Sequence, residues 1–182
     1  MRVITGIARG RKLLTLEGED VRPTTDRVKE AVFSVIQFET EGRRFLDLFA
    51  GSGQMGIEAL SRGAKEAVFV DNAKRSVEII RRNLASVKLE QSAKVVQTDW
   101  QSFLSVNSAK FDIAFLDPPY GKGILQSALA VLPAHMNKTG VIIAENPLNE
   151  EILSEYGEFA LDRQYRYGKI KISTYRNKEF LS

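Results

Sequence analysis

The sequence predicts an α/β protein whose core is a doubly wound, mostly parallel sheet. Five short apolar segments, each bounded by Gly, Asp or Pro, are separated by stretches in which apolar residues recur at helical spacing. Strands buried on both faces have such compositions, and repeated strand–helix units form sheets that bind ligands at the carboxyl ends of their strands. The predicted strands are 45–50, 67–71, 94–98, 111–117 and 140–145.

Helical patterns lie before and between these strands. Segment 54–62 ends before Gly63, a natural helix stop, and segment 73–88 carries one apolar stripe, formed by Val77, Ile80, Leu84 and Val87. A further helix is expected after Thr24 or Thr25, either of which can cap it. Its apolar face consists of Val28, Ala31, Val32, Val35 and Ile36.

The two ends of the chain have a different pattern. Segments 2–5 and 12–16 are expected to pair as a small hairpin around Gly6 and Gly10, and segments 159–167 and 169–176 as an antiparallel pair joined near Gly168. A chain of 182 residues fits one ordinary domain with a small appendage. We therefore divide it into a basic N-terminal extension, 1–22, and one domain, 23–182.

The composition excludes several classes of site. The chain has no cysteine, which rules out disulfides, thiolate zinc sites and cysteine nucleophiles, and its one histidine, His135, has no companion for a metal site or a catalytic triad. No metal is therefore expected. No segment approaches the roughly 18 apolar residues of a membrane span, so we expect a cytoplasmic protein with no membrane partner.

The positive charge gathers at both ends of the chain. The net charge is only +3, but four basic residues precede the first acidic one: Arg2, Arg9, Arg11 and Lys12. A C-terminal run contains no acid between Arg163 and Lys178. These clusters suit either phosphate contacts or a solvated surface.

A glycine-rich loop follows the first predicted strand and opens a helix. Gly51, Gly53 and Gly56 satisfy the GxGxxG pattern in this context, where glycine permits a tight turn and close approach of a ligand to the backbone. Asp71 ends the next strand, where its carboxylate can accept hydrogen bonds from ribose hydroxyls. The sequence therefore predicts a cofactor that contains a nucleoside.

Two more acids distinguish possible cofactors. Asp47 lies in the first strand, where dinucleotide sites usually keep apolar side chains, and suits a cationic amino-acid group; Asp99 ends the third strand and can meet an adenine amino group. The alternatives are a loop cap for Asp47 and Asp99 and a helix cap for Asp71. Trp100 follows Asp99 and either packs against adenine or belongs to the core.

The tetrapeptide Asp117-Pro118-Pro119-Tyr120 ends the fourth strand. Its prolines fix the backbone and remove two amide donors, which leaves a rigid turn rich in acceptors. Hydrogen bonds from a base amino group to Asp117 and to the Pro118 carbonyl would direct the nitrogen lone pair at a methyl group, while Tyr120 stacks on the base. An isolated tetrapeptide of this kind is more often a capped turn with a structural role. Its position at a strand end, in the same sheet as the glycine loop, favours a catalytic role here.

These residues carry a family resemblance. Segments 47–53 and 117–120, with Asp71 and Asp99, resemble the motifs of amino-methyltransferases with a Rossmann-like, seven-stranded fold whose last strand is antiparallel. The opening 2–13 and segment 22–33 are similar to the RsmD family of 16S ribosomal RNA guanine-N2 methyltransferases, and the likeness covers nearly the whole chain. Segment 117–120 also occurs in DNA methyltransferases. The likeness of the N-terminal segments is therefore what indicates RNA, and not DNA, as the substrate.

The resemblance implies methyl transfer from S-adenosylmethionine to guanine N2 of 16S rRNA, with S-adenosylhomocysteine as product and no metal. It implies a substrate within an assembling or assembled small ribosomal subunit and no obligatory protein partner. The catalytic residues would be Asp117, Pro118, Pro119 and Tyr120. The cofactor residues would be Asp47, Phe49, Ala50, Gly51, Ser52, Gly53, Asp71, Asp99, Trp100 and Thr24. The RNA-binding residues would be Arg2, Arg9, Arg11, Lys12 and Arg22.

Three alternatives stay open from the residues alone. A DNA adenine-N6 methyltransferase would use segment 117–120 equally well, although the chain has little room for a separate domain that reads sequence. A nicotinamide-dependent oxidoreductase would explain the glycine loop and Asp71 but would leave segment 117–120 without a role. The third alternative is a non-catalytic RNA-binding protein on a methyltransferase scaffold.

Overall fold

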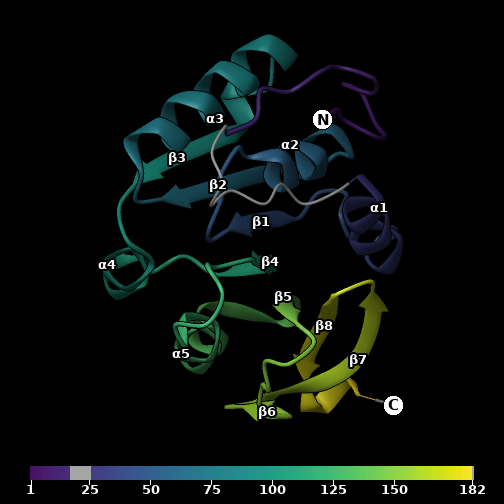
Figure 1. Cartoon of the computed structure of the whole chain (residues 1–182), viewed down its shortest axis with the longest axis vertical. Coiled ribbons are helices and arrows are strands. Elements are labelled where there is room, and N and C mark those ends of the chain that lie inside the picture. The colour runs from purple at the N-terminus through teal and green to yellow at the C-terminus, as the bar shows by residue number, and fades with distance from the viewer. Residues whose placement is uncertain (17–25, 182) are drawn as a thin grey trace.

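The computed structural model describes residues 1–16 and 26–181. In this part of the chain one eight-stranded sheet has the order β3-β2-β1-β4-β5-β8-β7-β6, which runs from the top to the bottom of Figure 1. The expected strand count of seven is therefore wrong by one. The additional strand is the short β6 (Glu155–Tyr156), which pairs with β7 at the sheet edge.

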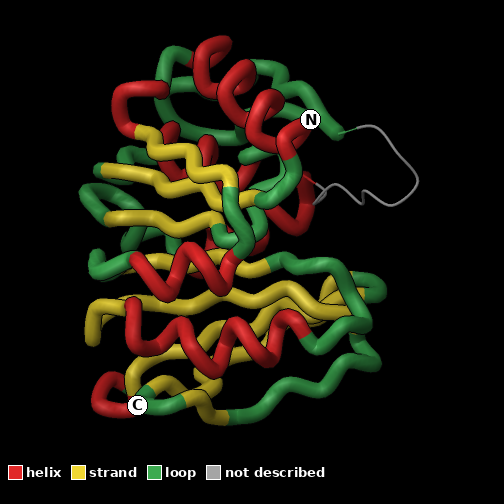
Figure 2. Tube along the Cα trace, turned by 90° about the vertical axis from the view of Figure 1, so that its left-hand side faces the viewer, coloured by secondary structure: helices red, strands yellow, loops and turns green. Residues whose placement is uncertain are grey.

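Five strands are parallel, as the sequence predicts. They are β1 (Arg44–Asp47), β2 (Glu66–Asp71), β3 (Ala93–Gln97), β4 (Phe111–Leu116) and β5 (Met136–Pro147). The antiparallel part consists of β8 (Ile170–Asn177), which pairs with β5, and β7 (Phe159–Tyr167), which pairs with β8. Figure 2 shows these strands stacked side by side.

Helices cover both faces of the sheet. One buried cluster contains apolar residues of α1 (Asp26–Val35), α2 (Gln54–Ser61) and α3 (Lys74–Val87), and a second contains those of α4 (Trp100–Val106) and α5 (Ile124–Val131). The predicted stripe of α3 is confirmed, because Val77, Ile80, Leu84 and Val87 are all buried. No helix among the described residues is long and apolar enough to cross a membrane.

The N-terminal segment 1–16 packs on the domain. Its predicted pairing is present as one antiparallel bridge between Arg2 and Lys12. Val3, Ala8 and Leu13 are buried in the first cluster, so the segment completes part of the core as well as exposing its charges. Thr24 and Thr25, the expected caps of α1, lie outside the described residues.

The buried carboxylate of Glu58 on α2 fastens this segment to the domain. Its two oxygens accept the backbone N–H groups of Ile4 and Thr5 at 2.8 and 2.9 Å. Arg62 donates to the same carboxylate at 2.8 Å, and Lys29 of α1 lies 3.8 Å away with its side chain fully buried. The buried charge of Glu58 is stabilised by these donors. Removal of the carboxylate would leave the donors without hydrogen-bond acceptors inside the protein.

Candidate functional site

Two cavities lie at the carboxyl ends of the parallel strands. The smaller, of about 110 Å³, is lined by predicted site residues from β1, the glycine loop and the end of β4: Asp47, Phe49, Ala50, Gly51, Ser52 and Asp117. The larger, of about 230 Å³, is lined by Phe49, Asp71, Asp99 and Trp100. Phe49 borders both cavities, so they are neighbours at this edge of the sheet.

The glycine loop allows the backbone to turn between β1 and α2. Gly51 and Gly53 have φ angles of +55° and +78°, a region that side chains rarely adopt. Gly53 precedes the first residue of α2 and does not line either cavity, so its role is conformational. Gly56 is required for packing, since a Cβ there would lie 2.3 Å from the Phe69 ring.

Asp47 is the buried acid of the site. Its side chain accepts the Gly56 N–H at 3.1 Å, and the residue is 2% exposed. Burial raises the pKa of Asp47 to about 7; the Gly56 hydrogen bond opposes this shift, and the nearby charge of Asp71 adds to it. A cationic group in the smaller cavity would favour the ionised carboxylate.

Asp71 both supports the loop and faces the larger cavity. One carboxylate oxygen accepts the Gly51 N–H at 2.8 Å and the other accepts the Ala73 N–H at 2.9 Å. Each oxygen has a second lone pair, so these bonds leave room for ribose hydroxyls. Asp71 is not the N-cap of α3, because Ala73 holds that position and no side chain caps the helix. The ligand role of Asp71 stays a prediction.

Asp99 caps α4 at the opposite wall of the larger cavity. It accepts the Ser102 N–H and the Ser102 hydroxyl, both at 2.8 Å, and these bonds lower its pKa. The cap interpretation is thus confirmed for Asp99, and its contact with adenine stays a prediction. Trp100 is half-buried against the second cluster, which confirms its core role. It also lines the cavity, and its contact with adenine stays a prediction.

The segment 117–120 leaves β4 beside the smaller cavity. Pro118 is buried and Pro119 is exposed, while Asp117 and Tyr120 are half-buried. The hydroxyl of Tyr120 donates to Glu145 Oε1 at 2.9 Å. Glu145 is 4% exposed and follows Ala144, which pairs with Leu116 immediately before Asp117. The two neighbouring strand ends therefore bring together Asp117, Tyr120 and Glu145.

The N-terminal segment also forms part of the site. Thr15 and Leu16 line the smaller cavity, a role that the sequence analysis did not assign. Asn83 of α3 fixes their position: it accepts the Leu14 N–H at 2.7 Å and donates to the carbonyls of Leu14 and Ser52 at 3.0 and 2.9 Å. One buried amide thus joins the segment to the glycine loop.

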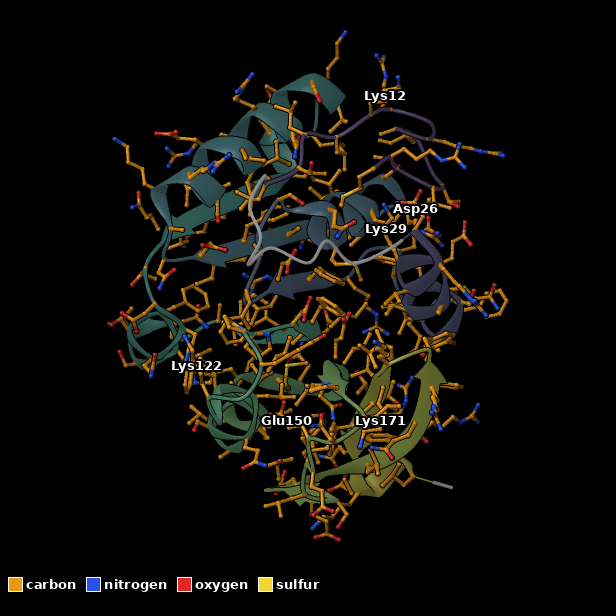
Figure 3. All side chains as sticks on the ribbon, viewed as in Figure 1. Lys12, Asp26, Lys29, Lys122, Glu150 and Lys171 are labelled. Atoms are coloured by element: carbon orange, nitrogen blue, oxygen red, sulfur yellow. The ribbon has the colours of Figure 1, made fainter. Side chains whose placement is uncertain are left out.

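The predicted RNA-binding residues of this segment are exposed. Arg2, Arg9, Arg11 and Lys12 all carry solvent-accessible side chains, and Figure 3 labels Lys12 on the segment above α1. By contrast, Lys29 of α1 is buried and donates to the Arg2 carbonyl. Arg22 and Thr24 lie outside the described residues. Among the residues that are described, no cluster of His, Asp or Glu could hold a metal ion.

Comparison with known proteins gives consistent matches. A family model described as conserved hypothetical protein 95 matches residues 1–176. The Bacillus subtilis protein YlbH is 36% identical over 183 residues, covering 98% of this chain and 100% of that protein. Ribosomal RNA small subunit methyltransferase D of Escherichia coli is 31% identical over 180 residues, covering 98% of this chain and 90% of that protein. The solved structure of Escherichia coli yhhF aligns with a TM-score of 0.88 at 30% identity, covering 97% of each chain.

Proposed function

Because the chain belongs to the conserved hypothetical protein 95 family, the RsmD family of rRNA methyltransferases, we propose that it methylates guanine N2 in 16S rRNA with S-adenosylmethionine. The observation that carries this proposal is the placement of Asp117 and Tyr120 beside the two acid-lined cavities. The substrate would be a guanine of 16S rRNA within an assembling or assembled small ribosomal subunit.

The two cavities fit the proposed methyl donor. The larger cavity offers Asp71 for ribose hydroxyls and Asp99 with Trp100 for adenine. The smaller cavity offers Asp47, whose burial makes its charge costly until a cationic ammonium lies near it. S-adenosylmethionine supplies an electrophilic methyl group on its sulfonium, and S-adenosylhomocysteine is left after transfer in line to the base nitrogen.

The protein's own contribution is to orient the base amino group. Asp117 and the Pro118 carbonyl would accept its two N–H bonds, which exposes the nitrogen lone pair and offers the departing proton an acceptor at the Asp117 carboxylate. Tyr120 would stack on a base that has left its helix or loop. Its hydrogen bond to Glu145 holds the ring, so Glu145 is a positioning residue. Most of the rate enhancement would then come from the positioning of two bound reactants.

The alternatives have less support. The name of the relative from Escherichia coli specifies ribosomal RNA, which favours an RNA over a DNA substrate. A nicotinamide-dependent oxidoreductase would not use Asp117 or Tyr120. A non-catalytic RNA-binding protein would not need them beside an acid-lined cavity.

A methyl-transfer assay tests the proposal. The purified chain is incubated with radiolabelled S-adenosylmethionine and either small subunits from a strain that lacks the modification, naked 16S rRNA or duplex DNA. We expect label in rRNA only, recovered as N2-methylguanosine by nucleoside mass spectrometry. Label in adenine, or equal methylation of duplex DNA, would overturn the proposed substrate.

A further inference from the structure

A groove of about 550 Å³ lies between α1 and β7, separate from the two cavities of the proposed active site. Its lining includes two tyrosines and an arginine of β7 and polar residues from the surrounding elements: Tyr165, Tyr167, Arg163, Arg176 and Glu39. Figure 1 shows β7 and β8 beside α1 at this place. The residues assigned to the active site do not include any of these side chains.

The two tyrosines lie two residues apart on β7, and both line the groove. They pair with Ile172 and Ile170, which are buried in the same cluster as the apolar face of α1, and both tyrosines are half-buried. Residues two apart on one face of a strand are separated by roughly 6.5 Å. This spacing is about twice the 3.4 Å rise between neighbouring bases, so it is compatible with bases stacked on the two rings.

The charges of the groove favour an anionic ligand at its rim. Glu39 and Asp162 are already engaged by Arg176, at 2.7 and 3.2 Å. The side chain of Arg163 is 70% exposed, and a hydrogen bond with Tyr165 raises the pKa of Arg163. Lys169, in the turn after β7, is also exposed. The two carboxylates of the groove are balanced by Arg176 and by Arg163, whose Nε lies 4.0 Å from Asp162. The exposed Lys169 adds a positive charge that phosphates can reach.

The groove opens at the edge of the sheet where the proposed chemistry occurs. Tyr167 pairs with Ile170, and Ile170 pairs with Pro147, the last residue of β5. Pro147 is two residues beyond Glu145, which holds Tyr120. A strand of RNA that leaves the active site can therefore continue along β7.

We propose that this groove binds a single-stranded stretch of RNA next to the methylated guanine, with its bases stacked on Tyr165 and Tyr167. The inference rests on the proposed function and adds a second contact to it. Stacking tolerates any base, because every base has an aromatic face. The groove would thus secure the strand without reading its sequence, and the active site would select the guanine.

Binding measurements with three variants test the groove. We expect Tyr165→Ala to weaken the affinity for a fluorescent single-stranded 16S rRNA fragment about tenfold, because each stacked base contributes at this scale. Tyr165→Phe keeps the ring and should bind as the wild type does. Arg163→Ala should reduce the slope of log affinity against log salt by about one unit or less. Arg75→Ala, an exposed arginine of α3 near the opposite end of the sheet, is the matched control and should change neither quantity.

Two further readouts separate the possible failures. Affinity for S-adenosylhomocysteine, measured by calorimetry, should be equal in all four variants, which shows that the fold and the cofactor site are intact. A wild-type enzyme that methylates rRNA, combined with unchanged RNA affinity in Tyr165→Ala, overturns the groove alone. A wild-type enzyme that methylates rRNA but binds no single-stranded fragment also overturns the groove alone, whereas a wild-type protein that methylates no rRNA overturns the proposed function.

Discussion

At the end of β4, Asp117 is the residue on which the proposed chemistry depends most. It lines the smaller cavity and would accept a hydrogen bond that strengthens in the transition state. We expect Asp117→Ala to lower turnover at least about a hundredfold, the scale of one lost donor–acceptor contact in a preorganised site. Calorimetry should show cofactor affinity nearly unchanged. Near-normal turnover would remove Asp117 from the mechanism.

The Tyr120–Glu145 hydrogen bond provides a second test at this scale. Because the bond holds the ring that would stack on the base, we expect Tyr120→Phe and Glu145→Ala each to lower kcat about tenfold, since small displacements of reacting groups cost up to about a hundredfold. The double variant should be no worse than either single one, because both remove the same interaction. Glu145→Gln keeps an acceptor and should recover most of the turnover.

The turnover of these variants also shows whether Glu145 positions Tyr120 or contacts the base directly. If Glu145→Gln is as impaired as Glu145→Ala while Tyr120→Phe is fully active, Glu145 contacts the base itself and the positioning role is wrong. Multiplicative losses in the double variant would lead to the same conclusion.

The raised pKa of Asp47 predicts a pH dependence of cofactor binding. Burial raises this pKa to about 7, so the carboxyl is protonated below pH 7 in the free protein and must lose its proton when a cationic ammonium binds. We therefore expect the affinity for S-adenosylmethionine to fall by up to about tenfold per pH unit as the pH decreases below 7. Calorimetry between pH 5.5 and 8 measures this slope. Asp47→Asn should flatten it, and an equal slope in that variant would assign the effect to another group.

Sequence reasoning found most of the residues that line the cavities but few of the contacts that hold them. Asp47, Asp71, Asp99 and Asp117 were predictable because each lies at the end of a parallel strand or within two residues after it. Asn83 and Glu58 were not, because their bonds join segments more than 50 residues apart in the sequence. Glu145 is the last residue of the predicted strand 140–145, and only the β4–β5 register shows that it lies beside Asp117.

At the scale of elements, the apolar patterns predicted the parallel strands, α2, α3 and the β7–β8 pair. The pattern failed where an element is short or has few apolar residues. Helix α4 was not predicted, although Asp99 and Ser102 form its cap, and β6 has only two residues. Strand β5 begins at Met136, before the predicted start at residue 140. Met136 pairs with Phe111 at the start of β4, and the register then shifts before Val141 pairs with Ile113.

The contact between α2 and β2 gives a prediction about stability. Alanine in a helix usually stabilises by about 0.5–1 kcal/mol relative to glycine. At Gly56 the added Cβ would meet the Phe69 ring at 2.3 Å, so overpacking should dominate and Gly56→Ala should destabilise the protein by about 1–3 kcal/mol. Urea denaturation measures the change. Phe69→Leu combined with Gly56→Ala should recover part of the loss, and a Gly56→Ala protein as stable as the wild type would contradict the packing role.

Considered as a whole molecule, the chain has exposed positive charge on two separate surfaces. The N-terminal segment lies over α2 and α3, and the groove lies between α1 and β7. Both reach the carboxyl edge of the sheet: the first through Thr15 and Leu16 at the smaller cavity, the second through Tyr167 beside the end of β5. A structured RNA could contact both while its target base enters the site between them.

The N-terminal segment can be tested without disturbing the fold. Its anchors are Val3, Ala8 and Leu13, which are buried, and the backbone bonds of residues 4 and 5 to Glu58. Its basic side chains are exposed, so a triple variant Arg9→Ala, Arg11→Ala and Lys12→Ala should keep its unfolding temperature and its affinity for S-adenosylmethionine. It should lose rRNA binding and methylation, because phosphate contacts supply affinity and orientation regardless of sequence.

The salt dependence of binding shows whether these three charges contact phosphates. Each phosphate contact contributes slightly less than one unit to the slope of log affinity against log salt, so the triple variant should reduce that slope by up to about 2 to 3 units. A matched variant with Arg75, Arg81 and Arg82 of α3 changed to alanine removes the same charge from another exposed surface and should leave the slope close to that of the wild type. If the N-terminal variant instead binds and methylates rRNA normally at several salt concentrations, the segment serves only to complete the core and the cofactor cavity. The phosphate contacts would then have to come from the exposed cations beside the groove, Arg163 and Lys169, where the loss of one charge should reduce the slope by about one unit or less.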